Sequence, residues 1–124
     1  MFGNTLLLCT AGGGSLCPVI TELRELEGTM CELGGWHDLY SVIAFKYSGK
    51  MLSPYAIIQY RNYNESASSA KNLNFNIGSA RVSEGYTIIA DLGECGPTSL
   101  QYIRMCWADA SYNQISGWSD WITW

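Results

Sequence analysis

Residues able to carry out acid–base or nucleophilic chemistry are few in this chain and poorly spaced for it. The only histidine, His37, restricts any catalytic triad to that residue. Asp38 follows it directly, and neighbouring residues of a strand point to opposite faces of a sheet, so the usual orienting pair cannot form. A cysteine–histidine pair would need Cys31 or Cys95, and neither lies in a catalytic sequence pattern. The sequence therefore predicts a protein that is not an enzyme and has no catalytic residues.

Metal and cofactor binding are not expected either. The glycines at 12–14 lack the lysine and the following helix of a phosphate-binding loop. The cysteines lack the paired spacing of a zinc site, and we interpret them as small buried residues in a reducing compartment, with a disulfide between Cys9 and Cys17 as the open alternative. The five cysteines are Cys9, Cys17, Cys31, Cys95 and Cys106.

Composition and charge indicate one folded domain with little affinity for nucleic acid. The chain has 124 residues, 48% hydrophobic and 15% charged, with a net charge of −4. Nucleic-acid binding needs clustered Lys and Arg, and these residues are scattered here. The 8 Tyr and 5 Trp favour strands over helices. No segment approaches the roughly 20 apolar residues of a membrane span.

The glycines at 12–14 divide the chain into an apolar N-terminal arm with its hinge, residues 1–15, and a body, residues 16–124. An isolated apolar strand is unstable, so the arm must pair with its own sheet or with a neighbouring subunit. Both alternatives stay open, and the second assigns partner binding to Phe2, Leu6, Leu7 and Leu8. The apolar run is too short, and lacks the preceding charge, for a signal peptide.

The body alternates between short apolar strands and polar turns. We predict strands at 39–47, 55–61, 72–77 and 86–92, a loop at 62–70 and a turn at 93–97. The segment 19–27 fits a helix and a strand equally well, and as a strand it would lie at a sheet edge. Alternation places Leu73, Phe75 and Ile77 inside, with three asparagines outside. This spacing predicts an all-β, antiparallel sandwich of about seven strands.

The C-terminal stretch completes the pattern. In 102–108 Ile103, Met105 and Trp107 would point inward, and a polar turn leads to a final strand that contains Trp118-Ser119-Asp120-Trp121. The body from residue 18 onward thereby resembles a fibronectin type III-like or related immunoglobulin-like domain. The Trp-Ser-Asp-Trp string is similar to the tryptophan–serine box of cytokine receptors.

That resemblance implies that Arg104, on the neighbouring strand, stacks between Trp118 and Trp121. Ile122 stands where the box has its second serine, and Gln101 occupies the position of an expected tyrosine, which departs from the family pattern. The surface-recognition candidates at this end are Arg104, Trp118, Trp121 and Trp124.

Two functions from different classes remain. The first is a structural component of a virus or phage particle, such as a capsid-decorating or tail-associated protein that is assembled in the host cytoplasm. It would be present in many copies or as a homo-oligomer, and it would contact other particle proteins through the arm. The alternative is a carbohydrate- or protein-recognition module that uses the C-terminal aromatic residues, at the cell surface or secreted without a signal peptide. Asn64-Glu65-Ser66 matches a glycosylation acceptor in form, but no secretion signal accompanies it.

Overall fold

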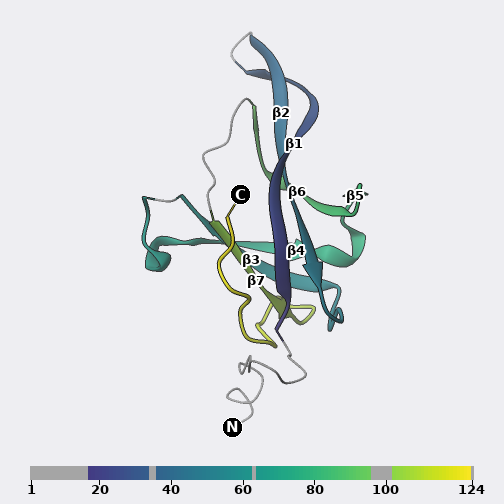
Figure 1. Ribbon diagram of the computed structural model, residues 1–124, viewed down its shortest axis with the longest axis vertical. Helices are drawn as coiled ribbons and strands as arrows, with labels where there is room; N and C mark the ends of the chain where they lie inside the picture. Colours follow the sequence, from purple (N-terminus) through teal and green to yellow (C-terminus); the bar gives the residue numbers. More distant parts are fainter. Residues whose placement is uncertain (1–16, 34–35, 63, 96–101, 124) are drawn as a thin grey trace.

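The computed structural model describes residues 17–33, 36–62, 64–95 and 102–123, which form two antiparallel sheets. The first sheet pairs neighbours in the order β1-β2-β6-β5 (Figure 1). Its strands are β1 (Val19–Leu33), β2 (Trp36–Ser48), β6 (Tyr86–Cys95) and the short β5 (Val82–Ser83). The far halves of β1 and β2 project beyond the rest of the sandwich (Figure 1).

The second sheet has the order β4-β3-β7, and two 3-10 turns flank its edge strand. The described residues contain no helix long and apolar enough to cross a membrane. The elements of this second sheet are β3 (Tyr55–Arg61), η1 (Ala67–Ser69), β4 (Lys71–Asn76), η2 (Ile77–Ser79) and β7 (Tyr102–Ala108).

The core lies between the two sheets. Phe45 of β2, Ile58 of β3, and Ile103 and Met105 of β7 have no exposed surface, and Trp107 retains 1%. Strand alternation explains this set, because every second residue of each strand faces the other sheet. Leu73 and Phe75 pack against this core and Ile77 lies in it, while the asparagines at 72, 74 and 76 are exposed, as predicted. An all-β antiparallel sandwich is therefore correct.

The segment left open between helix and strand is the edge strand β1. Ile20 and Leu23 are both buried although they are three residues apart. A register shift between Ile20 and Glu22 accounts for this, since Thr21 is an extra residue in β1 and reverses the alternation. The bulge produces the spacing of a helical face in an extended chain.

The strands differ from the predicted ones in three places. The turn predicted at 93–97 begins too early, because β6 continues to Cys95, which pairs with Tyr40. Strand β5 was not predicted, and it joins β6 through a turn in which Glu84 and Gly85 both have positive φ. The expected final strand is only two isolated bridges to β7, Ile103–Ile122 and Ala108–Gln114.

The cysteines do not behave alike. Cys106 is a free thiol with no exposed surface, as expected. Cys17 is disulfide-bonded to a cysteine whose side chain is not among those described, so the expectation of unpaired cysteines is wrong at this position.

Candidate functional site

The outer face of the second sheet carries a stack of cations and aromatic rings. Residue Gln59 of β3 pairs with Arg104 of β7, and Arg61 of β3 pairs with Tyr102. Alternation directs these side chains away from the core. The Arg104 guanidinium carbon lies 4.5 Å from the Trp118 ring centroid and 4.8 Å from that of Trp121. This contact with both tryptophans is the one that the sequence resemblance implies.

A second arginine extends the stack. The Arg61 guanidinium carbon lies 4.4 Å from the Tyr102 ring centroid and 4.6 Å from that of Trp121. The contacts therefore run in the order Tyr102, Arg61, Trp121, Arg104 and Trp118, which we call the arginine–aromatic ladder. Each cation–π contact contributes about 0.5–2 kcal/mol, depending on how far the pair is removed from water. Neither Arg61 nor Tyr102 was expected here.

Each of the two guanidinium groups also donates a hydrogen bond to a neighbouring residue. The Arg104 Nε–H donates to Gln59 Oε1 over 2.7 Å, and the Gln59 amide donates in turn to Asn72 Oδ1 over 2.9 Å. Arg61 donates to the backbone carbonyl of Glu65 over 2.9 Å. Neither guanidinium contacts a carboxylate in the described part of the chain. Burial, and to a smaller extent repulsion from Arg61, lower the pKa of Arg104 from its usual value.

Serine hydroxyls attach the tryptophan-bearing segment to β7. The Trp107 N–H donates to Ser116 Oγ, and the Met105 N–H donates to Ser119 Oγ, both over 2.9 Å. Both serines are buried. These hydroxyls replace backbone carbonyls as acceptors, which explains why no continuous strand forms after β7. At Ile122, where the receptor box has serine, the backbone exchanges bonds of 2.9 and 3.0 Å with Ile103, so the departure removes no attachment to β7.

The structure brings some of the predicted site residues together. Arg104, Trp118 and Trp121 form one half-buried cluster. Trp107, which was predicted to point inward, belongs to the core. The partner-binding prediction for the arm stays a prediction, as does the one for the last tryptophan. Their residues, Phe2, Leu6, Leu7, Leu8 and Trp124, lie outside the described residues.

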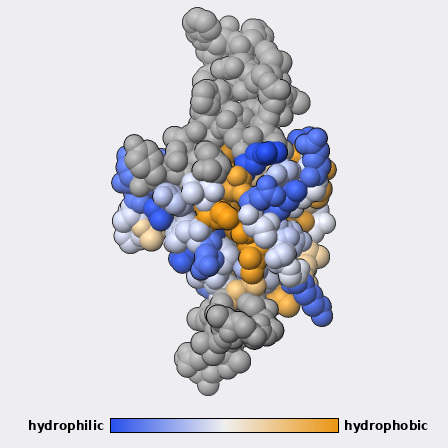
Figure 2. All heavy atoms as spheres, viewed as in Figure 1, coloured by the Kyte–Doolittle hydropathy of each residue, from blue (hydrophilic) through white to orange (hydrophobic). Residues whose placement is uncertain are grey.

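One end of the sandwich exposes apolar side chains. We call it the loop end, and it comprises Val19, the β2–β3 loop at 49–54 and the turn at 109–113. Val19, Met51 and Leu52 are 51%, 45% and 38% exposed. Figure 2 shows apolar atoms along the middle of this face and down to the lower end of the described part, where Figure 1 draws the β2–β3 loop.

Aromatic contacts support the loop end from inside. The Tyr55 and Tyr112 rings meet edge to face at 5.4 Å, which joins the start of β3 to the turn after β7. Tyr47 packs 5.7 Å from Trp107, and its hydroxyl donates to the Met51 sulfur over 3.9 Å. The two loops are thus fastened to each other and to the core.

The turn at 109–113 has a fixed conformation. The Asp109 carboxylate accepts the backbone N–H groups of Ser111 and Asn113 over 2.9 Å each. The bond from Asn113, the stronger effect, and that from Ser111 lower the pKa of Asp109. Tyr112 has a φ of 61°, a left-handed conformation that this network holds in place.

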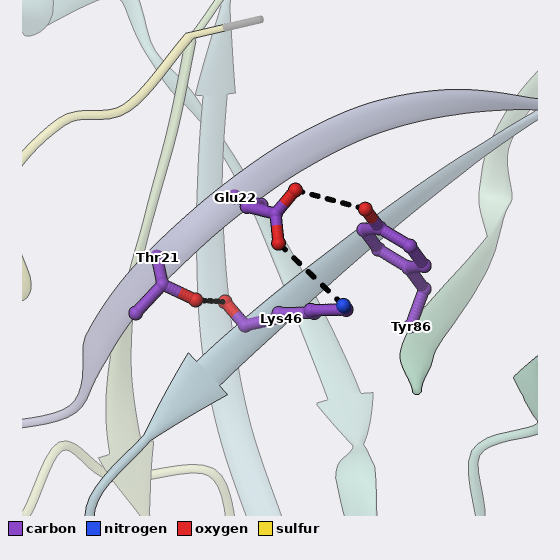
Figure 3. A network of polar contacts seen from close by, with 4 residues as sticks. All are labelled: Thr21, Glu22, Lys46 and Tyr86. Carbon is purple, nitrogen blue, oxygen red and sulfur yellow. Dashed lines mark hydrogen bonds and ion pairs between the residues drawn. The ribbon is translucent and has the colours of Figure 1, made fainter. Parts of the chain in front are cut away.

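A separate polar cluster lies on the outer face of the first sheet (Figure 3). The Tyr86 hydroxyl donates to Glu22 Oε1 over 2.9 Å, and Lys46 Nζ lies 3.5 Å from Glu22 Oε2 and 4.5 Å from the Tyr86 ring centroid. The Tyr86 hydrogen bond, followed by the Lys46 charge, lowers the pKa of Glu22. This cluster joins β1, β2 and β6 across the sheet.

Among the described residues, no group of three or more His, Cys, Asp or Glu side chains is arranged to hold a metal ion. Comparison of the chain with models of known protein families, with curated protein sequences and with solved structures finds no match. The local geometry of the chain itself therefore carries the functional argument.

Proposed function

We propose that this chain is a non-enzymatic recognition module that binds a partner protein through its loop end. The observation that carries this is the distribution of exposed apolar side chains. Among the residues whose side chains the structure describes, which leaves out 25–42 and 90–95 of the strands, four large hydrophobic residues are exposed, and three of them lie at the loop end, namely Val19, Met51 and Leu52. Apolar side chains grouped on an exposed end are typical of protein contacts.

The rigidity of the frame supports the same function. The Tyr55–Tyr112 contact and the Asp109 hydrogen bonds hold the loops before binding. A surface that is already ordered loses less conformational entropy on association, so more of the contact energy appears as affinity.

We further infer that the domain is fibronectin type III-like. The strand orders β1-β2-β6 and β4-β3-β7, with the C-terminal segment beside β7, support this inference. The stacking of Arg104 against Trp118 and Trp121 and the Ser119 hydrogen bond add to it, because they are similar to the arrangement of the cytokine-receptor box.

Sugar binding on the C-terminal tryptophans is less well supported. The Trp121 ring already contacts two guanidinium groups and Trp118 contacts one, so these rings serve as partners of Arg61 and Arg104. A sugar that stacks on Trp121 would have to compete with its two cations. The prediction of a virus or phage component depends on the arm, and no described residue bears on it.

The test uses the intact labelled protein on an array of purified extracellular proteins and, in parallel, on a glycan array. The variant Met51→Asp with Leu52→Asp places two charges on the loop end. The control is Val82→Asp, which places a charge on the fourth exposed apolar residue, in β5. We expect binding to a protein that the double variant weakens at least tenfold and the control leaves unchanged.

Two results would overturn the proposal. One is glycan binding that is lost in Trp118→Ala while no protein binds. The other is protein binding that the double variant retains and that deletion of residues 1–14 removes, which would assign the function to the arm. Urea unfolding of each variant, followed by tryptophan fluorescence, shows whether the fold is intact.

A further inference from the structure

We propose that Asn64 is the attachment site of an N-linked glycan in the mature protein. Asn64-Glu65-Ser66 fits the acceptor pattern Asn-x-Ser/Thr with a middle residue other than proline. The pattern alone is frequent by chance. Two independent structural observations turn it into a site.

The first observation is the position of the asparagine. Asn64 is exposed, in a turn between β3 and β4, and its side chain makes no hydrogen bond to the described part of the chain. Two exposed asparagines of β4 differ from it in this, since Asn72 accepts from Gln59 and Asn76 accepts from the Ser79 N–H. A glycan on Asn64 therefore displaces no contact of the fold.

The turn that carries Asn64 is also anchored. The Glu65 N–H donates to the Asn62 carbonyl over 3.0 Å, and the Asn62 N–H donates to Glu65 Oε1 over 2.9 Å. Arg61 donates to the Glu65 carbonyl from the ladder side. Figure 1 shows the 62–70 loop standing out from the sandwich, at the end of β3 opposite the β2–β3 loop. A glycan at this position leaves the loop end open to a partner.

The second observation is the disulfide at Cys17. Stable structural disulfides form in oxidising compartments, above all in the secretory pathway, which is also where N-linked glycans are added. A chain that passes through the secretory pathway can therefore acquire both modifications. The Cys17 bond removes the objection that the acceptor pattern lacks the right compartment.

The reaction needs a lipid-linked oligosaccharide pyrophosphate as co-substrate and the membrane transferase of the host. Asn64 Nδ2 forms a bond to C1 of the first sugar, while the bond from C1 to the pyrophosphate oxygen breaks. The lipid pyrophosphate leaves with the electron pair, and Nδ2 gives up one proton to a base. No oxidant or reductant takes part.

The test directs the full chain into the endoplasmic reticulum of cultured cells with an appended leader. Peptide maps of cell-associated and secreted protein are read only from material in which Cys17 is oxidised, so that every molecule counted has reached the lumen. We expect the peptide containing Asn64 to carry one oligosaccharide, which peptide N-glycosidase removes with conversion of Asn64 to Asp. Asn64→Gln and Ser66→Ala should abolish it.

Matched controls keep the test specific. Ser66→Thr preserves the acceptor pattern and should preserve the glycan, and Asn74→Gln, at an exposed asparagine outside the pattern, should have no effect. Urea unfolding of Asn64→Gln checks that the variant folds. Oxidised, folded protein with an unmodified Asn64 would overturn the proposal, and so would a glycan that persists in Asn64→Gln. The outcome is independent of whether the loop end binds a protein.

Discussion

Arg104 depends on the shape of its guanidinium group for its contacts in the ladder. Its planar group contacts two indole rings and donates to Gln59 at the same time. Lysine keeps the charge but has no planar group to lie against two rings. We therefore expect Arg104→Lys to lower the free energy of unfolding by about 1–2 kcal/mol, measured by urea unfolding.

The matched control is Arg24→Lys. Arg24 is exposed and lies 5.3 Å from the Tyr86 ring centroid, so it has one cation–π contact near the surface. Its change should stay within about 0.5 kcal/mol. Equal losses in the two variants would show that the ladder adds nothing beyond a surface contact.

Cys106 should be chemically silent in the folded protein. It has no exposed surface, and burial raises the pKa of its thiol to about 12. Iodoacetamide at pH 8 should leave the peptide containing Cys106 unmodified in native protein and modify it fully in denaturant, by mass spectrometry. Fast labelling of the native state would contradict this burial.

The same raised pKa predicts a loss of stability in alkali. An unfolded thiol ionises near pH 8.5, whereas the folded one retains its proton to about 12. The unfolded state therefore releases a proton that the folded state keeps, and stability falls as pH rises between these two values. Cys106→Ala should reduce that slope in urea unfolding.

Glu22 has the opposite pH dependence. The Tyr86 hydroxyl and Lys46 lower its pKa, so its contribution is present above the ordinary carboxyl pKa and is lost as pH falls through the lower folded value. Glu22→Gln should flatten the dependence of stability on pH between 5 and 3. Glu84→Gln, at an exposed position in the β5–β6 turn, serves as the control and should leave the curve unchanged.

At the scale of elements, the C-terminal segment depends on two hydroxyls. In Ser119→Ala the buried Met105 N–H loses its acceptor, which costs about 1–3 kcal/mol. Amide hydrogen exchange at Met105 should accelerate, and urea unfolding should shift to lower concentration. Ser68→Ala removes only an exposed contact with Ser66, so it should change neither measurement. If the Met105 amide stays protected in Ser119→Ala, the hydroxyl is not its acceptor in solution.

The sequence predicted the strands correctly where apolar and polar residues alternate without interruption. Strand β3 has the bounds expected for it, and the inward faces of β4 and β7 are those expected. In β1 the extra Thr21 shifts the alternation and imitates a helical face, so periodicity alone was ambiguous. Beyond Gly93, β6 continues because it pairs with β2, which local turn signals do not report.

The candidate site was predictable only in part for a related reason. Arg104 and the two tryptophans lie within one sequence stretch with a resemblance to a known box. Arg61 enters the ladder because β3 pairs with β7 in a register that opposes Arg61 to Tyr102. Sheet register is a tertiary property, and no spacing within either strand encodes it.

At the scale of the whole molecule, the arm remains the open question for assembly. Light scattering of the full chain and of a chain lacking residues 1–14 measures its contribution. The arm prediction expects an oligomer that becomes a monomer on truncation, since an apolar strand on a hinge needs a partner edge. An oligomer of equal mass in both forms would show that the arm is not needed for assembly. If the full-length chain is a monomer, the arm could act only by docking on a separate particle.

The ladder draws its rungs from three stretches of chain: residues 59–61, 102–104 and 118–121. The contacts of Arg104 with Trp118 and Trp121 join two stretches that are close in sequence. The contact of Arg61 with Trp121 instead requires that β3 has paired with β7, and that pairing closes a loop of about forty residues. The Arg61 contacts of the ladder should therefore form later in folding than the Arg104 contacts.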